Sequence, residues 1–120
     1  MEHLKVNEIT ITVVKDFHPK PYGRYITDGP DCDKTSGEVF RDKHLAPALK
    51  KHDKVTVDLT GYNRYGRSFL DESFGGLIRQ CGFTKAQLDE KLVYVHNDLT
   101  SVIAIIDERI QKAELKRIAG

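Results

Sequence analysis

Residues 55–59 read Val-Thr-Val-Asp-Leu and residues 68–77 read Ser-Phe-Leu-Asp-Glu-Ser-Phe-Gly-Gly-Leu, which together predict a buried strand followed by a helix. The first stretch is short, apolar and rich in β-branched residues, as is typical of a central strand. In the second, apolar side chains recur at helical spacing as far as Cys81, and Gly82 is suited to end a helix. Ser68 and Asp71 have capping-box spacing, so we expect this helix to begin within two residues of Ser68.

Strands and helices alternate on both sides of this pair. Residues 9–14 predict a first strand, and residues 22–26 predict a short second strand that pairs with it as a hairpin. Residues 92–95 predict a further strand, and helix-start signals occur at Thr35, Thr84 and Asp98. Such alternation favours a largely parallel sheet. We therefore predict an α/β fold: a mixed, largely parallel sheet with an N-terminal hairpin and helices packed on it.

Length, composition and charge limit the function classes. A chain of 120 residues, 39% hydrophobic and 31% charged, predicts a single domain over residues 1–120. Its 19 basic and 18 acidic residues lack the one-signed field that nonspecific nucleic-acid binding requires, which argues against that class of partner. No stretch approaches the ~20 apolar residues of a membrane helix, and the N-terminus has no signal-peptide pattern. We therefore expect a cytoplasmic protein without a membrane partner.

Residues that carry chemistry are few and scattered along the chain. Cys32 and Cys81 form no CxxC motif, and the five histidines have no metal-ligand spacing, so we expect neither a metal nor a cofactor. Asp71 and Glu72 lack a histidine or lysine at a spacing that would make them a catalytic pair. No segment resembles a nucleophile with its base, so the sequence predicts a non-enzymatic domain.

A group of polar residues surrounds the predicted start of the first helix, namely Arg24, Asp28, Ser36, Glu38 and Arg41. One interpretation is a small-ligand or nucleotide-binding domain that uses Arg24, Glu38 and Arg41, since helix N-termini bind phosphate oxygens. The other is a structural network of caps and ion pairs, in which Arg24 or Arg41 pairs with Asp28 or Glu38. The absence of a glycine-rich phosphate loop favours the structural interpretation.

The helix predicted after residue 68 contains a Gly-Gly pair and two serines. Each of Gly75 and Gly76 costs about 1 kcal/mol relative to alanine, which close approach of another backbone would offset. That backbone belongs either to the sheet or to a protein partner. Ser73 and Gly76 lie off the apolar stripe, so we expect them at the surface. Ser68 is either an N-cap, which stabilises a helix by about 1 kcal/mol, or a free hydroxyl at the exposed helix start.

These motifs resemble a known family. A strand ending Asp-Leu-Thr at 58–60 and the helix at 69–77 resemble the STAS fold of anti-sigma factor antagonists, whose pattern there is Asp-Leu-Ser and then Phe-Met-Asp-Ser-Ser-Gly-Leu-Gly. Asp-Gly-Pro at 28–30, Ser-Gly-Glu-x-Phe-Arg at 36–41 and Ser-Phe-Leu-Asp-Glu-x-Phe-Gly-Gly-Leu-x-Arg at 68–79 are closer still to the bacterial STAS-like domain of unknown function family. The similarity covers most of residues 9–113.

The resemblance implies a signalling function through a protein partner. In the antagonists, a kinase that is also the anti-sigma factor phosphorylates the second serine of Asp-Ser-Ser-Gly. Ser73 aligns with that serine, although Phe74 replaces the following glycine, and Ser68 is the alternative phospho-acceptor. The resemblance thus implies gating by serine phosphorylation and a partner of the anti-sigma ATPase-kinase class. The residues of the helix itself supply the expected location of partner binding, at Asp71, Glu72, Gly75 and Gly76.

Overall fold

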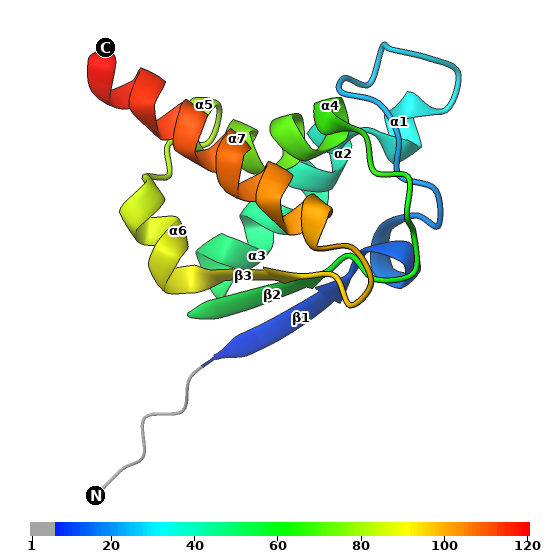
Figure 1. Ribbon diagram of the computed structural model, residues 1–120, viewed down its shortest axis with the longest axis horizontal. Helices are drawn as coiled ribbons and strands as arrows, with labels where there is room; N and C mark the ends of the chain where they lie inside the picture. Colours follow the sequence, from blue (N-terminus) through cyan, green and yellow to red (C-terminus); the bar gives the residue numbers. More distant parts are fainter. Residues whose placement is uncertain (1–6) are drawn as a thin grey trace, which may run out of the picture.

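A computed structural model describes residues 7–120 of the chain (Figure 1). Within these residues the sheet has three strands, β1 (Glu8–Thr12), β2 (Lys54–Asp58) and β3 (Leu92–Val95). They are all parallel in the order β1-β2-β3, with Ile9 opposite Val55 and Val55 opposite Leu92. The fold is therefore α/β, and the prediction that residues 55–59 form the central strand is confirmed.

Two helical runs follow β1 and β2 in the chain. The first helical run comprises α2 (Gly37–Phe40), the π-helical segment η2 (Arg41–Leu45) and α3 (Ala46–Lys51). The second helical run comprises α4 (Arg67–Leu70), the π-helical segment η3 (Asp71–Gly75) and α5 (Gly76–Arg79). The other helical elements are η1 (Val13–Phe17), α1 (Cys32–Thr35), α6 (Lys85–Lys91) and the long α7 (Thr100–Ala119). None of them combines the length and apolar character that a bilayer crossing requires.

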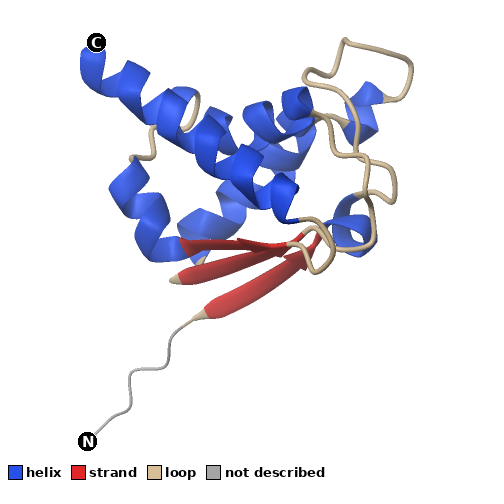
Figure 2. Cartoon of the chain, in the orientation of Figure 1, coloured by secondary structure: helices blue, strands red, loops and turns tan. Residues whose placement is uncertain are grey.

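The core lies between one face of the sheet and the helices, which Figure 2 shows on the same side of the strands. Val55 and Val57 point into this core and are fully buried, whereas Thr56 and Val93 are accessible on the opposite face. This alternation is the period-two pattern of a strand covered on one side. The helices contribute the largest buried side chains, which include Phe40, Leu49, Phe69, Phe74 and Ile106.

The predicted N-terminal hairpin is wrong. The first strand ends at Thr12, because the Asp16 carboxylate accepts a hydrogen bond from the Thr12 amide (2.7 Å) and the chain turns into η1. Residues 22–26 form a loop, because their backbone groups bond to the start of the first helical run and not to β1. Gly23 O accepts from Gly37 N (2.9 Å), and Arg24 O accepts from Glu38 N (3.0 Å).

The helix after β2 begins where the sequence predicts but is capped differently. α4 starts at Arg67, within two residues of Ser68, and its N-cap residue is Gly66. The prediction of Ser68 as an N-cap is therefore wrong, and so is its capping box with Asp71. Ser68 lies instead in the exposed first turn of α4, which leaves its hydroxyl without a capping role.

The other predicted helix starts agree within two residues. Thr84 and Gln87 form a complete capping box at the start of α6, as predicted. The N-cap of α2 is Ser36, one residue later than predicted, and its Oγ accepts from Val39 N (3.4 Å). Asp98 does not cap α7, because the helix begins at Thr100 with Leu99 as its N-cap residue and no side chain makes a capping bond. The Asp98 amide donates to His96 Nδ1 (3.1 Å) in the turn before the helix.

Candidate functional site

Two adjacent carboxylates, Asp71 and Glu72, are buried at the start of η3. Carboxylates are rarely buried without a partner, because removing their charge from water is costly. Arg24 Nη1 donates to Asp71 Oδ2 (2.6 Å), and Arg79 donates to both Asp71 oxygens (3.1 and 3.2 Å). Arg41 Nη1 donates to Glu72 Oε2 (2.5 Å) and to the Glu72 carbonyl (3.1 Å).

These groups form what we call the arginine–carboxylate cluster, and it joins four separate parts of the chain. Its members are Arg24 from the loop before α1, Arg41 from η2, Asp71 and Glu72 from η3, Arg79 from α5 and Arg109 from α7. Both π-helical segments in the two helical runs therefore contribute to it. π-Helical segments are rare and often occur at functional sites.

The contacts in the cluster favour the charged forms of Asp71, Arg24 and Arg41. Burial raises the pKa of Asp71, but the hydrogen bonds from Arg24 and Arg79 outweigh that effect and hold the pKa below its usual range. The hydrogen bond to Asp71 in turn raises the pKa of Arg24. Burial lowers the pKa of Arg41, and hydrogen bonds to Asp42 and Glu72 more than reverse this. Four guanidinium groups thus face three carboxylates, those of Asp42, Asp71 and Glu72, which leaves an excess of positive charge.

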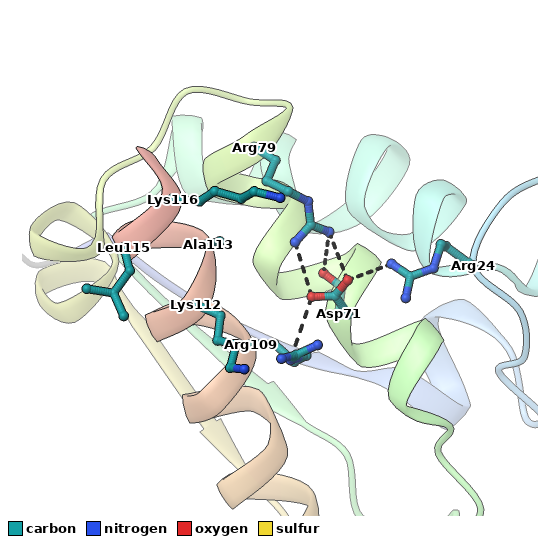
Figure 3. A pocket seen from close by; sticks show the side chains of 8 residues that line it. All are labelled: Arg24, Asp71, Arg79, Arg109, Lys112, Ala113, Leu115 and Lys116. Atoms are coloured by element: carbon teal, nitrogen blue, oxygen red, sulfur yellow. Dashed lines mark hydrogen bonds and ion pairs between the residues drawn. The ribbon is translucent and has the colours of Figure 1, made fainter. Parts of the chain in front are cut away.

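That excess borders an open pocket of about 720 Å³ between the second helical run and α7 (Figure 3). Three arginines converge there on Asp71, and two lysines of α7 lie beside them. The charged residues that line the pocket are Arg24, Asp71, Arg79, Arg109, Lys112 and Lys116, and Ala113 and Leu115 add an apolar part. Across residues 7–120, no group of three His, Cys, Asp or Glu side chains is placed to hold a metal ion.

The small residues of the second helical run are buried, so the surface expected at Ser73 and Gly76 is wrong. Ser73 is 0% exposed, and its Oγ donates to Gly37 O (3.4 Å). A Cβ on Gly76 would lie 2.5 Å from Arg41 Nη1. One on Gly75 would lie 2.8 Å from Arg79 Nη1, 2.9 Å from Asp71 Oδ1 and 3.3 Å from Arg109 O. The glycines therefore make room for the chain's own arginine and for the α7 backbone.

Asp71 and Glu72 are likewise turned into the molecule, so the four residues expected to contact a partner lie beneath the surface in this structure. The reason is that the second helical run is covered on two sides, by the first helical run and by α7. The apolar stripe that the sequence reveals is only one of its buried faces.

The polar group expected near the first helix divides into two sets. Asp28 Oδ2 accepts from the backbone amides of Arg24 (3.0 Å) and Tyr25 (2.9 Å), and Glu38 Oε1 accepts from Ile26 N (3.0 Å). Their carboxylates therefore fix the loop backbone, while Ser36 caps α2. The arginines Arg24 and Arg41 have acidic partners, but these are Asp71, Glu72 and, for Arg41, its neighbour Asp42 (2.9 Å). The predicted ion pairing with Asp28 or Glu38 is therefore wrong.

Sequence reasoning did not assign Arg79 and Arg109 to the site. A signal for Arg109 exists, because Arg109, Lys112 and Lys116 are spaced i, i+3 and i+7 and so share one face of α7. Arg79 lies eight residues after Asp71, a spacing that does not predict side-chain contact, yet its guanidinium also reaches the Asp71 carbonyl (3.1 Å).

The parallel sheet and the helical runs packed on it define the class of protein as an α/β domain (Figure 2). A family model described as STAS-like domain of unknown function (DUF4325) matches residues 36–102, more than half of the chain. The chain belongs to this family, which confirms the resemblance noted in its sequence. The matched segment holds both helical runs, β2 and β3. A comparison with curated proteins and one with solved structures found no match.

Proposed function

We propose that this STAS-like domain is a non-enzymatic signalling module that binds a regulatory protein partner at the surface around Ser68, and that phosphorylation of Ser68 weakens the binding. The observation that carries this proposal is the state of the Ser68 hydroxyl, which lies in an exposed first helical turn and has no capping role. A protein kinase needs such a hydroxyl, because the acceptor oxygen must enter the kinase active site.

Accessibility distinguishes the two candidate acceptors. Ser73 is fully buried under α2, so its phosphorylation requires the two helical runs to separate. Ser68 requires no such opening. The position that aligns with the phosphorylated serine of the antagonists is therefore the less suitable of the two, and the proposal places the phospho-acceptor at Ser68.

The charges around Ser68 suit an acidic partner surface. Arg64 and Arg67 are both exposed, and Arg67 Nη1 donates to Glu108 of α7 (2.6 Å). A phosphate adds a charge of about −1.5 to −2, which would offset these arginines and repel an acidic partner. The resemblance to anti-sigma factor antagonists supports an ATPase-kinase as the partner class. Asp71, Glu72, Gly75 and Gly76 then act indirectly, by holding the second helical run in place.

Phosphosite mapping tests the assignment of the acceptor. The chain is purified from cells that express it naturally, and its serines are analysed by mass spectrometry with phosphatase inhibitors present. We expect phosphate on Ser68 in a subpopulation of molecules and none on Ser73. Phosphate on Ser73 with Ser68 unmodified would contradict the proposal.

A further inference from the structure

We propose that the pocket between the second helical run and α7 binds a small anion that carries two adjacent phosphoryl groups. This inference is independent of partner binding at Ser68, because Ser68 is not among the residues that line the pocket.

The pocket concentrates positive charge that the composition of the chain does not predict. Five cationic side chains and one carboxylate line it, whereas the whole chain has a formal net charge of +1. The nearby acidic residues of α7 are engaged elsewhere: Glu114 accepts from Arg117 (2.8 and 2.7 Å), and Glu108 accepts from Arg67 (2.6 Å). Glu108 also lies 3.8 Å from Arg109 Nε, too far for a hydrogen bond.

The cluster has more hydrogen-bond donors than acceptors. The two oxygens of Asp71 already accept from Arg24 and Arg79. Glu72 Oε1 also accepts from Arg24 (3.3 Å) and Arg79 (3.5 Å). Arg109 Nε lies 3.8 Å from Asp71 Oδ1, and this buried atom has no hydrogen-bond partner among the described residues. A buried donor without an acceptor is costly, and phosphoryl oxygens are strong acceptors for guanidinium groups.

The size of the site favours two phosphoryl groups over one. Its volume of about 720 Å³ lies in the range of small-molecule sites. The cations of α7 extend from Arg109 to Lys116, a rise of about 10 Å along the helix. Arg24 and Arg79 face them with side chains that are 27% and 29% exposed, so their guanidinium groups are accessible from the pocket. A single phosphate cannot span this row of cations, whereas a diphosphate reaches more of it.

Calorimetric titration with inorganic pyrophosphate and with orthophosphate, at constant ionic strength, tests the proposal. The informative variant is Lys112→Gln/Lys116→Gln, because both lysines are exposed and lie outside the buried ion pairs. The matched control is Lys50→Gln/Lys51→Gln, which removes the same charge from exposed lysines that do not line the pocket. We expect pyrophosphate to bind more tightly than orthophosphate, and the pocket variant to weaken it at least about tenfold. The control variant should change the affinity less than about twofold, because screening limits the reach of distant surface charges.

Amide NMR shifts locate the binding, and adenosine diphosphate identifies the source of the phosphoryl groups. Pyrophosphate should move the amides of α7 around residues 109–116 and those of residues 71–79. Tighter binding of the nucleotide than of pyrophosphate would point to an organic diphosphate as the ligand, and equal binding would point to the phosphoryl groups alone. Three results would overturn the proposal: no binding of pyrophosphate, the same affinity for orthophosphate as for pyrophosphate, or the same loss of pyrophosphate affinity in the pocket variant and the control variant.

Discussion

Arg41 Nη1 and Glu72 Oε2 lie 2.5 Å apart, and the two side chains are only 6% and 3% exposed. The pair joins η2 of the first helical run to η3 of the second, where Arg41 also donates to the Glu72 carbonyl (3.1 Å). A pair that is this buried fixes the relative position of two helices, because separating the two charges leaves each with only more distant or more exposed partners, Asp42 for Arg41 and Arg24 and Arg79 for Glu72. It therefore connects the sequence motifs at residues 36–41 and 68–79.

Loss of both members of this pair should cost less than the sum of the two single losses. Glu72→Leu or Arg41→Leu alone should lower the free energy of unfolding by about 1–3 kcal/mol, since each removes the shortest and most buried partner of the other charge. Arg41 then keeps only Asp42 (2.9 Å), and Glu72 keeps only Arg24 (3.3 Å) and Arg79 (3.5 Å). The double variant should lose less than the sum of the two. Urea unfolding monitored by circular dichroism measures all three. Asp89→Asn, which breaks the exposed Lys85–Asp89 pair, is the control and should cost less than about 1 kcal/mol. Strict additivity of the two single changes would contradict this account.

Gly76 should not tolerate a methyl group. Gly76→Ala places a Cβ 2.5 Å from Arg41 Nη1, and the Arg41 side chain is held by Glu72 and by packing. We expect a net loss of about 1–3 kcal/mol in unfolding free energy, even though alanine is the better helix former. Gly66→Ala is the matched control, because its Cβ meets nothing within 4 Å and its φ is −82°. Equal stability of the two variants in thermal unfolding would show that Arg41 moves aside without cost.

The contribution of Asp71 to stability should depend on pH. Its pKa is lowered in the folded state, so the stability it provides is present above the unfolded value of about 3.9 and is lost as the pH falls through the folded pKa. The difference in unfolding free energy between the wild type and Asp71→Asn should therefore be largest near neutral pH and shrink below about pH 4. Urea unfolding in a pH series at constant ionic strength gives this difference. If the difference in unfolding free energy did not shrink below about pH 4, Asp71 would not be paired as the structure shows.

The two serines should respond in opposite ways to aspartate. Ser73→Asp places a carboxylate beside Gly37 O in a fully buried position, and we expect it to destabilise the fold by several kcal/mol, on the order of 3. Ser68→Asp puts the same charge in an exposed first helical turn, where the helix dipole favours it by about 0.3–1 kcal/mol. Thermal unfolding of both variants checks this. A Ser73→Asp variant as stable as the wild type would show that Ser73 is more accessible than the structure has it.

The elements that the sequence predicts correctly are those fixed by local pattern. Val55 and Val57 alternate with polar residues along β2, and the apolar stripe that includes Leu77 repeats at helical spacing, so both patterns are visible in a short window. The predicted hairpin is wrong because the backbone groups of its two segments have other partners. Thr12 bonds to Asp16, and residues 22–24 bond to the start of the first helical run, where Gly37 lies.

The candidate site depends on contacts that no short window contains. Arg24 and Asp71 are 47 residues apart in the sequence, and Arg109 lies in α7, the last helix of the chain. Sequence reasoning identified Arg24, Arg41, Asp71 and Glu72 as notable, but it assigned them to two different surfaces. Their union in one buried cluster follows from the packing of the two helical runs, which only the three-dimensional fold reveals.

Partner capture with charge-matched variants tests the central claim most directly. The wild type, Ser68→Ala, Ser68→Asp and Ser101→Asp are used as baits in lysates of cells that express the chain naturally, and bound proteins are quantified by mass spectrometry. Ser101 is the control because it is the second residue of α7, as Ser68 is of α4, and both are exposed. The account predicts one partner retained by the wild type, Ser68→Ala and Ser101→Asp and lost by at least about tenfold with Ser68→Asp. Equal retention by Ser68→Asp, or equal loss with Ser101→Asp, would contradict it.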